Sequence, residues 1–235
     1  PGVCYVITGP GLTNILTPLG QAYSDSVPVL AISSCLDEVA ARRGQLHQMR
    51  DQRAAAATVC DWSEEARTAE AAYNLIDRAF SEFDTSRRRP KHIQVPISVL
   101  EARAPAAPAR LEDALLEKNS RDLHLGREIA HALKQARRPV MILGGGATRG
   151  AGIYGEISTL CGAAVICTYA GRGIIPGDHP YYFGSTLARP DSATVLAQAD
   201  LVMVIGSELA EVDLWRHEAG YSCPTIRIDI DPSLM

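Results

Sequence analysis

Short apolar runs alternate with segments of helical spacing along almost the whole chain, and this alternation limits the fold more than any other feature. The apolar runs are typical of buried strands and lie at residues 3–7, 29–32, 92–96, 139–143, 164–167, 201–205 and 225–229. Between the first two runs, Leu12, Ile15 and Leu19 have the spacing of a helix. Strands that alternate with helices favour parallel sheets with helices on both faces. The sequence therefore predicts an α/β chain.

Two local features refine the expected helices of the first half. Pro18 lies inside the first helical segment, so that helix is expected to be kinked or shortened there. Ser63, followed by Glu64 and Glu65, has the pattern of an N-cap with an acidic first turn. A helix is therefore predicted to begin at Ser63.

A change of composition divides the chain. Around Pro105 and Pro108 the sequence consists mainly of alanine and proline, which favours extended backbone and opposes helix formation. We therefore predict a linker at residues 104–122 between two domains, residues 1–103 and 123–235. Each is expected to be a three-layer domain with a parallel sheet, the second of them Rossmann-like. Because the first apolar run starts without a lead-in, the chain is expected to be a piece of a longer protein, cut inside its first domain.

Charge and cysteine content exclude several classes of protein. The 235 residues carry a formal net charge of −4, without the concentrated basic face that nucleic acid needs. The arginines at 87–89 precede a proline and are interpreted as a solvated helix end. No apolar run approaches the roughly 20 residues that span a bilayer. The six cysteines are far apart with no CxxC pair, so we expect neither a disulfide framework nor a zinc site, and a cytoplasmic location.

Two glycine-rich turns follow predicted strands and could bind a ligand. Gly9-Pro10-Gly11 lies between a strand and a helix, where backbone N–H groups point outward, but a plain tight turn explains it equally well. Gly144-Gly145-Gly146 lies where dinucleotide folds hold a pyrophosphate, yet Arg149 occupies the slot of the last glycine of that fingerprint. At the end of the last predicted strand, Asp229 could accept hydrogen bonds from a ribose or cap the following turn.

Taken together and in order, these segments resemble a known family. The run Gly9-Pro10-Gly11-Leu12-Thr13-Asn14, followed by Asp25-Ser26-Val27-Pro28-Val29, is similar to the pyrimidine-binding domain of thiamine diphosphate enzymes of the acetolactate synthase group. The runs at 139–146, 199–207 and 228–232 are similar to the central domain of the same group. The resemblance covers nearly the whole chain.

The resemblance implies a cofactor, a substrate class and a set of site residues. Such enzymes use thiamine diphosphate with Mg²⁺ on 2-oxo acids and share the cofactor between subunits of a homo-oligomer. Pro10, Gly11 and Asn14 match positions that line the pyrimidine pocket, and Gln48 falls near an active-site glutamine of the family.

The family's catalytic glutamate would precede Pro1, and its Mg²⁺-diphosphate domain would follow Met235. No catalytic residue is therefore predicted in this chain, and the chain by itself is expected to be inactive. Glu208 and Glu211 replace the basic and aromatic residues of flavin-bearing members, which predicts that FAD is not bound.

Two functions remain open at this stage. The first is part of a thiamine diphosphate-dependent enzyme that decarboxylates or carboligates a 2-oxo acid. The second is a stand-alone dinucleotide-binding or regulatory module built on the second half, which tight binding of NAD or FAD would favour.

Overall fold

A computed structural model of the chain describes residues 1–37, 44–108 and 123–234. The chain divides into two compact units, Pro1–Ala114 and Leu115–Met235. Residues 109–122 of the predicted linker lie outside the described residues. The predicted domain limits at residues 103 and 123 therefore stay predictions.

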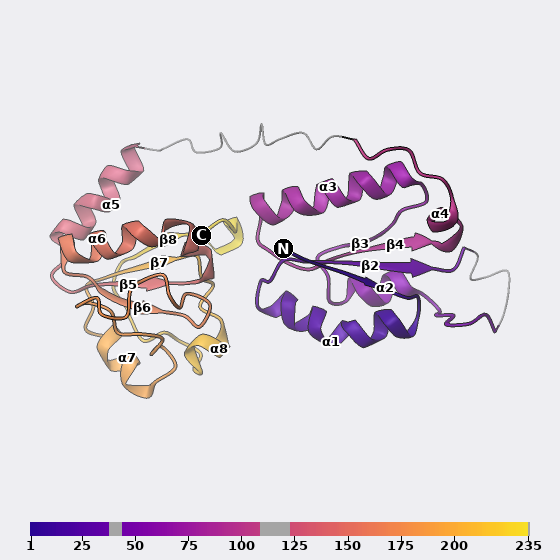
Figure 1. Cartoon of the computed structure of the whole chain (residues 1–235). Coiled ribbons are helices and arrows are strands. Elements are labelled where there is room, and N and C mark those ends of the chain that lie inside the picture. Colours follow the sequence, from indigo (N-terminus) through magenta and orange to yellow (C-terminus); the bar gives the residue numbers. More distant parts are fainter. Residues whose placement is uncertain (38–43, 109–122, 235) are drawn as a thin grey trace. The chain divides into compact units, whose positions relative to one another are not determined.

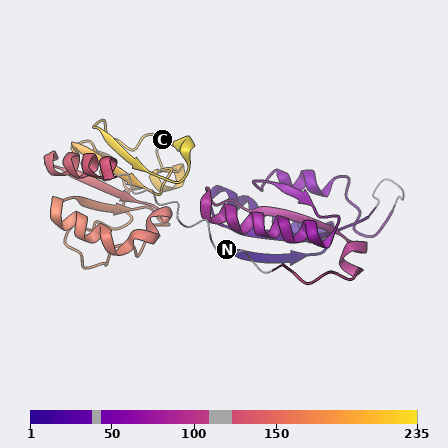
Figure 2. The same cartoon turned by 90° about the horizontal axis from the view of Figure 1, so that it is seen from above.

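The first unit is built on a parallel sheet of four strands. These are β1 (Gly2–Val6), β2 (Val29–Cys35), β3 (Ser63–Glu65) and β4 (Lys91–Pro96), in the order β1-β2-β4-β3. Helices α1 (Pro10–Ser24) and α2 (Gln52–Ala57) lie on one face, and α3 (Ala69–Thr85) lies on the other (Figure 1). In the view of Figure 2, α3 lies over the strands. The short helix α4 (Ile97–Glu101) follows β4.

The second unit repeats this plan. Its sheet contains β5 (Pro139–Leu143), β6 (Ala164–Cys167), β7 (Leu201–Ile205) and β8 (Thr225–Ile228), all parallel and in the order β6-β5-β7-β8. Helices α5 (Leu123–Gln135) and α6 (Ala151–Cys161) cover one face, and α7 (Pro190–Leu196) and α8 (Glu211–Leu214) cover the other (Figure 1). The 3₁₀ segments Gly145–Gly150 and Pro232–Leu234 complete the described elements. The predicted α/β class, with two three-layer parallel-sheet domains, is confirmed.

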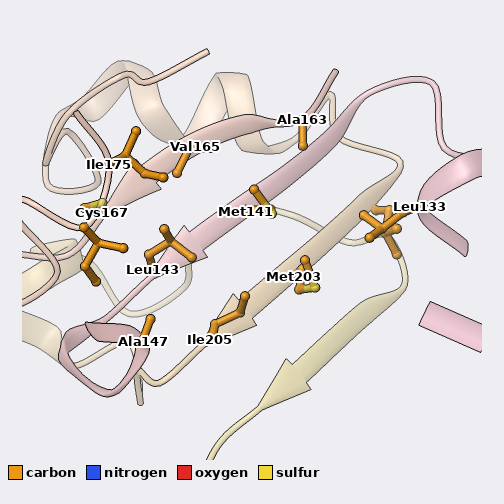
Figure 3. Close-up of a cluster of buried hydrophobic side chains, with 12 residues drawn as sticks. Leu133, Met141, Leu143, Ala147, Ala163, Val165, Cys167, Ile175, Met203 and Ile205 are labelled. Carbon is orange, nitrogen blue, oxygen red and sulfur yellow. The ribbon is translucent and has the colours of Figure 1, made fainter. Parts of the chain in front are cut away.

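Alternating strand residues supply the two faces of each core. In the second unit, Met141 and Leu143 of β5, Val165 of β6 and Met203 of β7 point to the side of α5 and α6 (Figure 3). The intervening residues, among them Val140, Ile142, Val202 and Val204, pack against α7 and α8. Burial on both faces explains why these strands are continuous apolar runs rather than alternating ones.

Charge is buried at the amino end of β4. The Lys91 side chain is 1% exposed, and its Nζ lies 2.8 Å from Asp61 Oδ2 and 2.7 Å from Glu82 Oε2. Glu82 also accepts hydrogen bonds from Trp62 Nε1 and Arg78 Nε. Burial alone would raise the pKa of Glu82, but its hydrogen bonds, that from Lys91 first, lower it to about 2. The cluster ties α3 to the sheet at the end away from the groove described below.

Three local expectations need correction. Residues 2–6 form a parallel strand, but β1 is an edge of the described sheet, so Val3 and Tyr5 are exposed rather than buried. Helix α1 is not shortened at Pro18 but continues to Ser24, with Pro18 on its exposed side; a kink at Pro18 stays a prediction.

The third correction concerns Ser63, which begins strand β3 and not a helix. Helix α3 begins six residues later, and its N-cap is Thr68, whose hydroxyl accepts a hydrogen bond from the Ala71 amide at 3.0 Å. The arginines at 87–89 follow the end of α3 and are partly exposed, and two of them also contact the segment after α1 or its last turn. The Arg89 guanidinium stacks on Tyr23, and Arg87 Nε donates to Ser26 Oγ.

Candidate functional site

A groove of about 430 Å³ lies in the first unit at the carboxyl ends of β1 and β2. Its walls combine four apolar side chains with polar groups; the lining residues are Ile7, Thr8, Ser34, Leu36, Gln45, Leu46, His47 and Ile97. In open parallel sheets, ligands bind in the crevice outside the carboxyl ends of the strands. The groove therefore occupies the position expected of a binding site in this fold.

The turn at Gly9 directly follows Thr8, which lines the groove, and requires glycine. Gly9 has φ 65° and ψ −110°, a combination that L-residues rarely adopt. A Cβ added to Gly9 would lie 2.2 Å from the carbonyl oxygen of His47, which itself has a φ of 61°. The segment around His47 thus lies directly against the turn, and Thr8 and His47 both line the groove.

Gln52, at the start of α2, binds this turn through hydrogen bonds from the side away from the groove lining. Its side-chain oxygen accepts hydrogen bonds from the Thr8 hydroxyl at 2.9 Å and from the Gly9 amide at 2.8 Å. Gln52 is 7% exposed, so both bonds are shielded from water. The Thr8 amide donates in addition to Ser34 Oγ at 2.9 Å. The turn is therefore held through side chains from α2 and β2.

The amide nitrogen of Gln52 faces the sheet. It lies 3.0 Å from Ser33 Oγ, 2.8 Å from the Ser34 carbonyl oxygen and 3.4 Å from Gln94 Oε1. One side chain thus joins the β1–α1 turn to both central strands of the sheet.

A buried polar chain continues from Ser33 across the sheet. Ser33 Oγ lies 2.8 Å from His92 Nε2, and Ser63 Oγ lies 2.7 Å from His92 Nδ1. His92 is fully buried, and burial lowers its pKa to about 4. The imidazole is therefore neutral near pH 7, and both ring nitrogens have partners. This part of the network is structural, because it lies below the groove and does not line it.

The predicted site residues divide into two groups. Pro10, Gly11 and Asn14 lie together in the first turn and a half of α1, with Pro10 and Asn14 exposed. Gln48 lies in the turn before α2, where its side-chain oxygen accepts a hydrogen bond from the Gln45 amide at 3.3 Å. The assignment of these four residues to a cofactor site stays a prediction.

Three further polar residues beside or behind the groove, Thr8, Ser34 and Gln52, are not predicted by the sequence patterns. Thr8 directly follows the apolar run at 3–7, and Ser34 lies two residues after the run at 29–32. Both lie near the carboxyl ends of predicted strands, where parallel folds bind ligands, and this signal could have identified them. Gln52 begins an alanine-rich helix, and its sequence neighbours do not distinguish it.

The second glycine-rich turn serves packing within its own unit. A Cβ on Gly144 would lie 2.2 Å from the Gly206 carbonyl oxygen, and one on Gly146 would lie 2.8 Å from the Gly206 Cα. Glycine at these positions lets the turns after β5 and β7 approach each other closely. Asp229 Oδ1 accepts a hydrogen bond from the Asp231 amide at 3.0 Å, so Asp229 caps the last turn.

Two kinds of feature are absent from the described residues. Among residues 1–37, 44–108 and 123–234, no group of three His, Cys, Asp or Glu side chains could hold a metal ion. In the same ranges, no helix is long and apolar enough to cross a membrane.

Comparison with known proteins identifies the family. The model described as "Thiamine pyrophosphate enzyme, N-terminal TPP binding domain" matches residues 1–55, which contain the Gly9 turn, most of the groove and Gln52. The model described as "Thiamine pyrophosphate enzyme, central domain" matches residues 127–235. The chain belongs to the thiamine pyrophosphate enzymes. The family resemblance found in the sequence is confirmed.

Curated relatives of this thiamine pyrophosphate enzyme chain are named for several different activities. A probable 2-ketoarginine decarboxylase of Pseudomonas aeruginosa is 40% identical, over 99% of this chain and 42% of the relative. A glyoxylate carboligase of Escherichia coli O157:H7 is 30% identical, over 99% of this chain and 40% of the relative. An acetolactate synthase of Mycobacterium bovis is 28% identical, over 99% of this chain and 38% of the relative. The chain thus spans about 40% of the length of these relatives.

Proposed function

We propose that this chain is part of a thiamine diphosphate-dependent enzyme that decarboxylates or carboligates a 2-oxo acid. The observation that carries the proposal is the buried Thr8–Gly9 turn beside a groove at the carboxyl ends of β1 and β2, inside the region that matches the TPP-binding model. The names of the relatives, two of which are a decarboxylase and a carboligase, support this reaction class.

The residues around the groove fit the aminopyrimidine ring of the cofactor. Ile7, Leu36 and Ile97 offer apolar walls for a flat ring, and Leu46, which is 79% exposed, would be covered by it. Thr8, Ser34 and His47 offer hydrogen-bonding groups for the ring nitrogens and the amino group. When bound, thiamine diphosphate supplies an electron sink for the carbanion formed from a 2-oxo acid.

In this proposal the chain supplies the pyrimidine side of the site. Pro10, Gly11 and Asn14 line the entrance at the start of α1, and Gln48 lies on the opposite, loop side. The Mg²⁺ and the diphosphate are held by parts of the protein other than the residues described here. A second subunit of a homo-oligomer completes the site, and the protein works in the cytoplasm without FAD.

The alternative function, a dinucleotide-binding module, has less support. The glycines of the second unit that could admit a pyrophosphate are used for contact between the turns after β5 and β7. Asp229, the candidate ribose ligand, already accepts a hydrogen bond from the amide of Asp231.

The proposal is tested by titrating thiamine diphosphate, with Mg²⁺, into the protein that contains this chain. Asn14→Leu should raise the dissociation constant at least about tenfold, which corresponds to roughly 1.4 kcal/mol and to the loss of one polar contact. Gln21→Leu is the matched control, because Gln21 is also exposed and lies two turns further along the same face of α1. Equal affinity of the wild type and Asn14→Leu would contradict the assignment of Asn14. A wild type that binds no thiamine diphosphate would contradict the function itself.

A further inference from the structure

We propose that Gln52 is a positioning residue that holds the Thr8–Gly9 turn in the conformation required for ligand binding. The identity of the ligand as thiamine diphosphate rests on the function proposed above, whereas the role of Gln52 in holding the turn does not. Gln52 does not line the groove, so it acts through the two residues that it binds.

The orientation of the Gln52 amide is fixed by its partners. The Gly9 backbone N–H can only donate, so the Gln52 atom at 2.8 Å from it must be the oxygen. The Ser34 carbonyl oxygen can only accept, so the atom at 2.8 Å from it must be the nitrogen. A flipped amide would place donor against donor and acceptor against acceptor. The side chain therefore has one allowed orientation, with its oxygen toward the turn.

The turn depends on this oxygen for two of its polar groups. Gly9 precedes α1 and has no side chain with which to cap the helix. Its amide and the Thr8 hydroxyl both donate to Gln52 Oε1, and both residues are buried. Without Gln52, these two buried donors would lose the acceptor that they share.

Two contacts on opposite sides thus fix the unusual backbone of Gly9. The His47 carbonyl oxygen lies close to the position that a Cβ of Gly9 would occupy. Gln52 accepts a hydrogen bond from the Gly9 amide and is itself bound to Ser34 on β2 and Gln94 on β4. Because the first turn of α1 starts at Pro10, a shift of Gly9 moves Pro10 and Gly11 with it. Gln52 therefore sets the position of the predicted pyrimidine-binding residues relative to the sheet.

The test is hydrogen–deuterium exchange of the peptide that covers residues 7–14, measured on the protein that contains this chain and without cofactor. Gln52→Leu should raise the exchange rate of the Gly9 amide at least about tenfold, because its acceptor is lost. Gln52→Glu keeps an acceptor toward the turn but has a donor for the Ser34 carbonyl oxygen only when it is protonated, so it should restore only part of the protection that Gln52→Leu loses. If Gln52→Leu does not fold, Gln52→Asn, which cannot reach the turn, serves in its place.

Ser63→Ala is the matched control. It removes a buried hydrogen bond of similar length from the far end of the same network, to His92, and leaves the contacts of Gln52 intact. It should leave exchange of residues 7–14 within about twofold of the wild type. The dissociation constant of thiamine diphosphate should rise at least about tenfold in Gln52→Leu and remain unchanged in Ser63→Ala.

An unchanged exchange rate of the Gly9 amide in Gln52→Leu would overturn the proposal, because Gln52 would then not hold the turn. An equal increase of the exchange rate in Ser63→Ala would also overturn it, because the effect would then be a general loss of stability. Equal cofactor affinity of Gln52→Leu and the wild type would also overturn it. If the wild type does not bind thiamine diphosphate, the proposed function fails, and the exchange measurement still decides the role of Gln52.

Discussion

Replacing Gly9 by alanine tests the geometry of the site most sharply. The backbone of Gly9 (φ 65°, ψ −110°) costs an L-residue roughly 1–3 kcal/mol. The added Cβ would lie 2.2 Å from the His47 carbonyl oxygen, and relief of such a contact costs roughly 1–3 kcal/mol more, because a backbone atom must move. Gly9→Ala should therefore lower the free energy of unfolding of the first unit by about 2–6 kcal/mol, a large part of the usual domain stability.

The two tryptophans of the chain allow this to be measured in the first unit alone. Trp62 lies in the first unit and Trp215, which is 72% exposed, in the second. In a Trp215→Phe background, urea unfolding followed by fluorescence reports the surroundings of Trp62. The control is Gly44→Ala, since Gly44 also has a positive φ (70°) but nothing lies within 4 Å of its added Cβ. That variant should lose only about 1–2 kcal/mol. Equal losses in the two variants would refute a close contact between Gly9 and His47.

Two further predictions concern the buried ionisable groups of β4. Lys91→Met should lower the free energy of unfolding by about 2–3 kcal/mol, because the partly exposed carboxylates of Asp61 and Glu82 lose a fully buried partner. The free energy is measured by urea titration, and the control is Lys134→Met, since Lys134 is exposed. His92 has its pKa lowered to about 4 by burial, so the folded state excludes a proton that the unfolded state binds below about pH 6.5. The contribution of His92 to the free energy of unfolding should thus be fully present above that pH. The free energy of unfolding should fall by about 2 kcal/mol between pH 7 and pH 5. If the free energy of unfolding of His92→Asn fell by the same amount between pH 7 and pH 5, the loss could not be attributed to His92.

The fold could be predicted because its main determinant is local. Strands buried on both faces appear as continuous apolar runs, and β5 and β7 are clear examples. The prediction of a helix start at Ser63 is wrong because Ser-Glu-Glu suits a helix start and a strand equally well. In the structure, the side chains of Ser63 and Glu65 pair with His92 and Gln94 on β4. These tertiary partners, almost 30 residues away in sequence, determine that the segment is a strand.

The site could be predicted only in part, for the same reason. The glycines at 9 and 11 mark a turn that needs them, and the family pattern adds Pro10 and Asn14. Gln52 lies 44 residues from Thr8 and 18 from Ser34 in sequence, so only the folded sheet brings the three together. Burial of its amide, rather than any motif, identifies Gln52 as the residue that connects the turn to the sheet.

The most direct test of the central claim is a crystal structure of the protein that contains this chain, with thiamine diphosphate and Mg²⁺ bound. We expect the aminopyrimidine ring to occupy the groove at the carboxyl ends of β1 and β2, in contact with residues of the turn from Thr8 to Asn14. An aminopyrimidine ring bound elsewhere in the protein, with this groove filled by other parts of the chain, would contradict the account.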